Sequence, residues 1–214
     1  MKRTQAKAVA KPATGNPVRE RILCAAFEAF VENGYAATTT LNIATRASVS
    51  KRELYAHFGS KQAILVACIT GRAPRMRLPP GLPPPRDRRE LAAALTAFGT
   101  ILTREVSHPT VMATFRLAIA EAERSPEVAE ALDRFGRDAA RAALAGLLAE
   151  AQAAGLIGPG APVAMARQYL ALLWEDLMVE LLLRVADPPA PGEIKRRAAK
   201  ATAALLALHP PLAG

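Results

Sequence analysis

Six prolines lie between residues 74 and 85, and they constrain the fold more than any other feature of the chain. Proline lacks the backbone N–H that a helix requires, and its ring clashes with the preceding turn, so no helix crosses this segment intact. We therefore predict a Pro-rich linker over residues 74–87, which divides the chain into a short N-terminal part and a longer C-terminal part.

Both parts are predicted to be helical. Hydrophobic residues make up 51% of the chain, alanine and leucine dominate, and β-branched residues are sparse outside the first third. This composition favours an all-α fold. Apolar residues that recur three and four positions apart, together with the breaks between them, predict helices near 17–33, 39–47 and 51–57, a fourth helix that begins at residue 61, and further helices near 88–106, 109–123, 126–154, 161–185 and 191–208.

The second and third predicted helices are joined by a turn of only three or four residues. Ser50 and Glu53 form an S-x-x-E capping box at the start of the third helix. Three short helices with such a turn make a helix-turn-helix, which lays the N-terminal residues of its second helix against base edges in the major groove. We therefore predict that residues 17–73 are a DNA-binding domain, with Ser50, Lys51, Arg52 and Glu53 facing the bases.

The positive charge of the chain is confined to its first third. The net charge is +9, and residues 1–77 hold 13 lysines and arginines against four acidic residues, whereas residues 78–214 hold 15 of each. A basic head on a neutral body is the electrostatic pattern of a polyanion-binding protein. We interpret residues 1–16 as a flexible basic arm; a merely solvated basic terminus is the alternative that the charge distribution leaves open.

The stretch GYAATTTLNIATRASVSKRELYAHFGSKQAIL resembles the TetR/AcrR family of bacterial transcriptional regulators. The resemblance covers about residues 20–69. The matched residues, at the family's spacing, are Gly34, Tyr35, Thr38, Thr39, Ile43, Ala44, Val49, Ser50, Leu54, Tyr55, His57, Phe58, Ser60 and Lys61.

The resemblance implies a role for each of the polar residues. Tyr55 and Lys61 would each bind a backbone phosphate, and Thr39 would anchor the second helix on the DNA backbone. His57 would lie near the base-facing residues, although a packed histidine is equally expected, and simple core packing is the alternative for Tyr55. Ser48 stands where the family commonly has glycine, so we expect a strained turn there.

The C-terminal part, residues 88–214, is predicted to be an effector-binding and dimerisation domain. The segment LLWEDLMVELLLR is apolar on nearly all sides, and the last helix carries small residues suited to close packing. The family resemblance implies a homodimer through the last two helices, and two heads on a two-fold axis suit a palindromic operator. A monomer with a buried helical hairpin is the alternative.

The stretch HPTVMATFRLAIAEAERSPEVAEALDRF resembles the effector domain of the AefR-like subgroup. The resemblance implies a small-molecule effector, apolar or amphipathic, that releases the protein from DNA. Aromatic and methionine side chains at helical spacing also fit an ordinary core. The candidate ligand-binding residues are Phe98, Met112, Phe115, Arg116, Tyr169, Trp174 and Met178.

Other classes of function fit less well. The histidines His57, His108 and His209 are scattered, so neither a metal site nor a catalytic pair is predicted, and no cofactor is implied. The chain has no secretory signal and no long apolar run, so we expect a cytoplasmic protein without membrane contact. A helical small-molecule-binding protein without DNA binding, or an activator of the same architecture, remains the alternative, and a redox role of Cys24 or Cys68 stays open.

Overall fold

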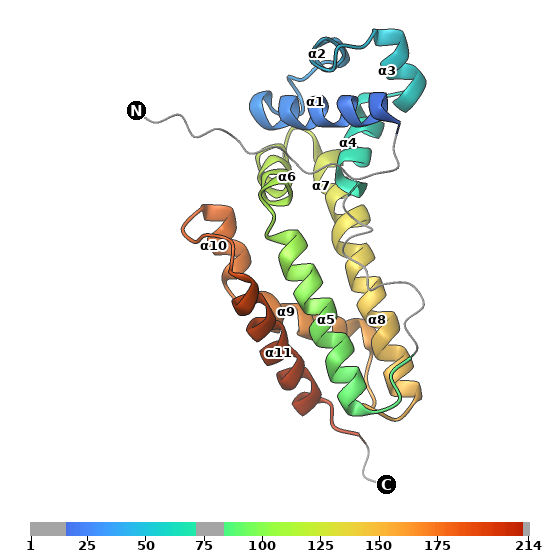
Figure 1. Ribbon diagram of the computed structural model, residues 1–214, viewed down its shortest axis with the longest axis vertical. Coiled ribbons are helices and arrows are strands. Elements are labelled where there is room, and N and C mark those ends of the chain that lie inside the picture. The colour runs from blue at the N-terminus through green and yellow to red at the C-terminus, as the bar shows by residue number, and fades with distance from the viewer. Residues whose placement is uncertain (1–15, 72–83, 212–214) are drawn as a thin grey trace.

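Figure 1 shows the computed structural model of the protein, which describes residues 16–71 and 84–211. The described chain is helical and contains no strand, which confirms the all-α prediction. The predicted arm, apart from Asn16, and most of the predicted linker lie outside the described residues. The elements are α1 (Pro17–Asn33), α2 (Thr40–Arg46), α3 (Lys51–Phe58), α4 (Lys61–Thr70), α5 (Arg88–Val106), α6 (Pro109–Ala120), α7 (Pro126–Leu132), the π-helix η2 (Asp133–Arg137), α8 (Asp138–Ala153), α9 (Pro162–Trp174), α10 (Leu177–Leu183) and α11 (Pro191–Leu208).

We call helices α1 to α4 the head and helices α5 to α11 the body. A side chain caps the N-terminus of each of the four helices of the head. The cap residues are Asn16, Thr39, Ser50 and Ser60, and each side chain accepts a hydrogen bond from a backbone N–H in the first turn of its helix. Such a cap satisfies one of the N–H groups that a helix start leaves without a partner, and it stabilises the helix by about 1 kcal/mol. Local sequence therefore determines where these short helices start.

The core of the head is built from one apolar side chain or more on each of α1 to α4. Ile22, Phe30, Ile43, Leu54 and Ile64 are fully buried in it. The same core also includes residues of the C-terminal part, on α6 and α7: Leu117, Ala118, Val128, Ala131 and Leu132. The head and the body therefore share one apolar cluster, and this contact joins segments that are far apart in the sequence.

The body is an elongated bundle in which α5 and α11 run side by side, with α8 and α9 packed against them (Figure 1). Tyr169 on α9 is fully buried between α5 and α11, and its hydroxyl donates a hydrogen bond to the Leu95 carbonyl at 2.6 Å. Gly99 gives this hydroxyl its space, because a Cβ at that position would lie 2.3 Å from the Tyr169 oxygen. These contacts fix the centre of the bundle.

The prediction of one continuous helix over 161–185 is wrong. The helix breaks at Glu175, whose φ is +43°, and resumes as α10. Arg197 on α11 donates to the carbonyls of Leu173 and Trp174 at 3.3 Å and to the Glu175 carboxylate at 3.1 Å, and Lys200 pairs with the same carboxylate at 2.9 Å. Helix α9 ends here because the Arg197 side chain of α11 donates to its last carbonyls. The local sequence of α9 does not reveal this contact.

The helix predicted over 126–154 is present as one uninterrupted run, but residues 133–137 form a π-helix within it. Such π-segments are rare and occur frequently at functional sites. The helix predicted over 109–123 ends at Ala120, because Ala122 and Arg124 bond to carbonyls three residues earlier in a tight final turn.

The expected strain at Ser48 is present. Ser48 follows α2 with a φ of +54°, in the left-handed region that favours glycine. The N–H of the next residue, Val49, donates to the Ala44 carbonyl at 3.0 Å, which closes the turn between α2 and α3.

We expect Ser48→Gly to raise the free energy of unfolding by up to about 1 kcal/mol, because it removes the Cβ clash of the left-handed conformation. Ala47→Gly is the control: Ala47 has a φ of −77°, so glycine there should lower stability by about 0.5–1 kcal/mol. Urea unfolding of both variants tests the expectation, and an equal loss of stability in both would contradict it.

Candidate functional site

The N-terminal turn of α3 lies open to solvent. Ser50, Lys51 and Arg52 are exposed, whereas Leu54 is fully buried against the rest of the head. Ser50 accepts a hydrogen bond from the Glu53 N–H at 3.0 Å, which is one half of the predicted capping box. The helix is thus held by one face and presents two cations and its own N-terminus on the other. Such an end attracts phosphate and can reach base edges.

Tyr55 is a surface residue, so the alternative that it is simply a core residue is wrong. Its side chain is 42% exposed, and its hydroxyl lies 3.3 Å from the Thr40 hydroxyl, across the turn between α2 and α3. The Lys51 ammonium lies 5.8 Å from the centre of the Tyr55 ring. The sequence did not identify Thr40, since only the fold brings together two residues that are 15 positions apart. His57, also on α3, is half-buried.

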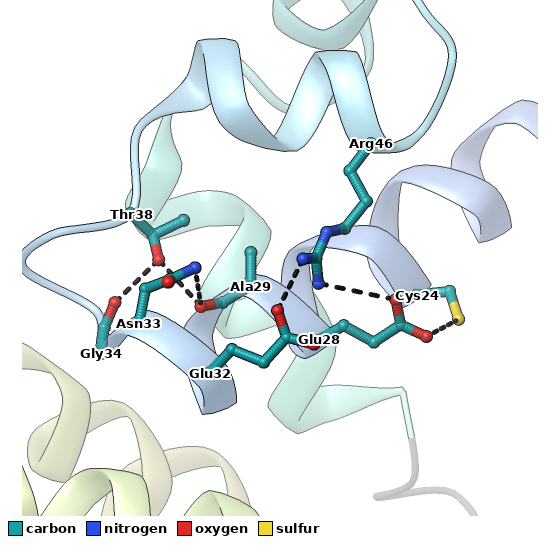
Figure 2. Close-up of polar contacts among 8 residues, drawn as sticks. All are labelled: Cys24, Glu28, Ala29, Glu32, Asn33, Gly34, Thr38 and Arg46. Carbon is teal, nitrogen blue, oxygen red and sulfur yellow. Dashed lines mark hydrogen bonds and ion pairs between the residues drawn. The ribbon is translucent and has the colours of Figure 1, made fainter.

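Polar contacts fix α2 on α1 (Figure 2). Arg46, in the last turn of α2, pairs with Glu32 at 2.6 Å and with Glu28 at 3.7 Å, both on α1. The hydrogen bond from Arg46 lowers the pKa of the Glu32 carboxyl. The buried Thr38 hydroxyl lies 3.0 Å from the Ala29 carbonyl and 2.7 Å from the Gly34 carbonyl. Arg46 is therefore occupied within the head, unlike the cations of α3 that point to solvent.

Lys61, for which a phosphate contact was predicted, is engaged within the head itself. Its ammonium donates to the carbonyls of Tyr35 at 2.8 Å and Thr38 at 3.0 Å, with the Ala36 carbonyl at 3.4 Å. It also lies 4.3 Å from the centre of the Tyr35 ring. These carbonyls belong to residues 34–38, between α1 and α2, which we call the junction loop. Lys61 thus ties the start of α4 to the junction loop.

Glu121 holds the same loop from the body. It is the C-cap residue of α6, is only 8% exposed, and accepts hydrogen bonds from the N–H groups of Tyr35 at 3.1 Å and Ala36 at 3.3 Å. Gly34 is required beside it: its φ is +82°, and a Cβ would lie 2.5 Å from the Glu121 carboxylate. An anion from the body and a cation from the head therefore hold opposite polar groups of one loop.

A cavity of about 240 Å³ lies between α4 of the head and the helices of the body. Its wall includes the end of α4 and the start of α6, the two helices whose other ends reach the junction loop. The residues that line it are Cys68, Ile69, Leu102, Val106, Thr110, Val111, Thr114, Phe115, Leu132, Gly136, Arg137, Ala140, Arg141, Leu170, Trp174 and Met178.

Three of the predicted ligand-binding residues line this cavity: Phe115, Trp174 and Met178. The other four lie elsewhere. Phe98, Met112 and Tyr169 are core residues of the bundle, buried to 3% exposure or less. Arg116 donates to the carbonyls of Leu181 and Leu182 at the end of α10. Residue type alone does not separate a cavity wall from a core, because aromatic side chains suit both.

The two cysteines are poorly suited to redox chemistry, which requires a thiolate. Burial raises the pKa of the Cys68 thiol to about 12. Partial burial and the neighbouring Glu28 carboxylate also raise the pKa of the exposed Cys24 thiol. Both thiols are therefore neutral near pH 7.

Within residues 16–71 and 84–211, none of the helices has the length and apolar character that a bilayer-spanning segment needs. The described side chains likewise bring together no group of three or more histidine, cysteine or acidic residues that could bind a metal ion.

Comparisons with known protein families match most of the chain. Residues 22–68, which contain the helix-turn-helix, match the family described as bacterial regulatory proteins, tetR family. Residues 93–209, more than half of the chain, match the C-terminal domain of the AefR-like transcriptional repressors.

Relatives and solved structures agree with these matches. The HTH-type transcriptional regulator YvkB of Bacillus subtilis is 33% identical over 92 residues, which is 43% of this chain and 47% of the relative, so the match spans about half of that relative's length. A TetR transcriptional regulator from Agrobacterium tumefaciens has a similar structure, with 28% identity, a TM-score of 0.73, and coverage of 91% of this chain and 95% of the other. The flavonoid-responsive regulator FrrA is 28% identical, with a TM-score of 0.71 and coverage of 92% and 98%.

We expect Glu121→Ala to free the junction loop. Hydrogen bonds to a charged group contribute about 1.5–3 kcal/mol, so the amides of Tyr35 and Ala36 should exchange with solvent deuterium at least tenfold faster in the variant. Glu123→Ala is the matched control, because Glu123 is an exposed carboxylate two residues away. Unchanged exchange at both amides in Glu121→Ala would show that the carboxylate does not hold the loop.

Proposed function

Because the chain belongs to the TetR family of bacterial regulatory proteins, we propose that it is a homodimeric, cytoplasmic repressor that a small apolar or amphipathic ligand releases from a palindromic operator. The observation that carries this proposal is the exposed N-terminal turn of α3, which lies within the first 77 residues, the part of the chain that holds its whole excess of positive charge. This arrangement serves binding rather than catalysis.

Two kinds of DNA contact are expected from the head. Lys51 and Arg52 stand at the solvent-facing start of α3, where arginine and lysine pair with guanine O6 and N7. Tyr55 and Thr39 offer hydroxyl groups, which suit phosphate contacts that position the protein without reading sequence. Glu53 and His57 lie on the same helix, within the surface that DNA would cover.

The family motif implies that Lys61 binds a phosphate, but we propose a different role for this residue. Its contacts to three carbonyls of the junction loop, at 2.8, 3.0 and 3.4 Å, engage the donors of the ammonium. We therefore assign Lys61 mainly to positioning the loop that precedes α2, which supports DNA binding indirectly.

Ligand binding can reach the DNA surface through α4 and α6. Cys68 and Ile69 at the end of α4 line the cavity, and Lys61 at its start holds the junction loop. In the same way, α6 lines the cavity with Thr110, Val111, Thr114 and Phe115, and its C-cap residue Glu121 holds the loop from the other side. A ligand that shifts either helix would displace the loop, and with it α2 and α3. FrrA, whose name describes a flavonoid-responsive regulator, supports a small organic effector.

The outer face of the last helices suits the proposed dimer. Ala199, Ala203 and Ala207 lie exposed along α11 at four-residue spacing, so a partner helix could approach closely. Large apolar side chains are also exposed on or next to these elements, including Val163, Val179, Leu183, Val185 and Leu208. The proposed dimer would cover exposed apolar side chains of this kind, as protein contacts do where such side chains gather on one face.

The first test is fluorescence anisotropy with DNA from upstream of the protein's own gene, against a scrambled sequence, at two salt concentrations. Tight binding to the native fragment that weakens steeply with salt supports a sequence-specific regulator. Equal and weak binding to both DNAs would contradict an operator in that fragment, and selection from random DNA would then show whether any operator exists.

We expect Tyr55→Phe to weaken binding to every DNA sequence and Arg52→Ala to relax specificity at one base position by about 1–3 kcal/mol. Arg89→Ala is the control, because it removes the same charge from the exposed start of α5, at the far end of the body (Figure 1). Binding to an operator and to its single-base variants measures the difference. An equal effect of Arg52→Ala on all sequences would contradict base reading.

We expect Ala203→Glu to convert the dimer into a monomer of 22.7 kDa, because it places a charge in the proposed close contact of α11. Ala149→Glu, on the exposed side of α8, is the matched control and should leave the dimer intact. Light scattering after size-exclusion chromatography gives both masses, and a dimeric Ala203→Glu protein would place the interface elsewhere.

A further inference from the structure

The wall of the cavity is mostly apolar, and the charge that it carries is positive. Among the described residues that line it, Arg137 and Arg141 carry charge, and no aspartate or glutamate is present. The two arginines are four residues apart and therefore lie on one side of the helix. They occur where the π-helix η2 passes into α8, and Gly136 of the same π-helix also lines the cavity.

The charge of these arginines is only partly balanced. Arg137 donates to Asp133 at 2.8 Å and Arg141 to Asp138 at 2.6 Å, with one N–H in each of these bonds. A guanidinium has five N–H donors, so others remain for a ligand. The Arg141 side chain is 22% exposed, whereas its partner Asp138 is 51% exposed. Water therefore screens Asp138 better than Arg141, whereas Arg137 is the more exposed member of its own pair, at 58% against 46% for Asp133.

The rest of the cavity wall suits a flat, apolar ligand. Trp174 and Phe115 supply aromatic surface, and Met178 supplies a polarisable thioether. The Thr114 hydroxyl donates to the Thr110 carbonyl at 3.0 Å and keeps its lone pairs as acceptors. Cys68 stays neutral near pH 7, since burial raises the pKa of its thiol to about 12, so it adds no charge that would repel an anion.

The volume limits the size of the ligand. About 240 Å³ is below the roughly 300–1,000 Å³ of sites that hold drug-sized molecules. One aromatic ring or a fused pair fits this space. A ligand without an acceptor near Arg141, whose side chain is only 22% exposed, would leave N–H donors of this residue facing an apolar surface, which is costly.

We infer that the effector is a small aromatic carboxylic acid, with its ring between Trp174, Phe115 and Met178 and its carboxylate on Arg141 and Arg137. Arginine binds carboxylate with two parallel N–H donors, which adds geometric selectivity to the attraction of opposite charges. The inference rests on the proposed function, since it names the chemical class of the ligand that the cavity takes.

A matched pair of probes tests the charge requirement directly. Naphthalene-2-carboxylate and naphthalene-2-carboxamide have nearly the same shape, and only the first is an anion at pH 7.5. Isothermal titration calorimetry of the full-length protein should give a dissociation constant at least tenfold lower for the carboxylate. Equal affinities, or no binding of either probe, would overturn the inference.

Single-residue variants test whether Arg141 causes the preference for the carboxylate over the amide. Arg141→Gln should remove most of the tenfold difference, and Arg141→Lys should restore part of it by returning the charge. Arg134→Gln is the control, because Arg134 belongs to the same π-helix but lies 5.4 Å from the centre of the Phe135 ring and does not line the cavity. Circular dichroism confirms that each variant is folded. An unchanged preference in a folded Arg141→Gln protein would place the anion elsewhere and overturn the assignment.

The same probes separate this inference from the proposed function. If the carboxylate binds in an Arg141-dependent way and lowers affinity for operator DNA, both are supported. If it binds in that way but leaves DNA binding unchanged, the ligand class stands and ligand-controlled release fails. If the amide binds as tightly as the carboxylate and both release DNA, the proposed function stands and the anion inference fails.

Discussion

The arrangement of this molecule depends on the contacts that two oppositely charged side chains, Glu121 and Lys61, make with the junction loop. Glu121 binds two N–H groups of the loop and Lys61 binds carbonyls of the same loop. A carboxylate that is only 8% exposed is costly unless its oxygens accept hydrogen bonds, so this contact defines one position of the loop sharply. Gly34 provides the space that the contact needs.

The hydrogen bonds to the junction loop fix the orientation of the head on the body, which the apolar cluster that they share does not do alone. Apolar packing of α1 and α4 on α6 and α7 keeps the two parts together but is not directional. Hydrogen bonds to the loop add the orientation that α2 and α3 need, because the loop leads directly into α2. The cavity lies at the opposite ends of α4 and α6, so binding and orientation are linked through two helices rather than through a flexible segment.

The candidate DNA surface could be predicted in large part from the sequence, because it is determined locally. The caps at Thr39 and Ser50 and the left-handed turn at Ser48 depend on residues a few positions apart. The exposure of Lys51 and Arg52 follows from the burial of Leu54 on the other face of the same helix. Lys61 shows the limit: its motif implies a phosphate contact, but its partners lie 23 to 26 residues away in the chain.

The sequence by itself determined the helical class, the helix starts of the head, and the surface that suits DNA, since caps, periodicity and charge act over short distances. Only the tertiary structure decided which aromatic residues line the cavity and which fill the core, since Phe98 and Trp174 look alike in a helical pattern. It also decided the break at Glu175, made by side chains of α11, and the role of Glu121, which meets a loop 86 residues away. These contacts depend on which helices the fold places side by side.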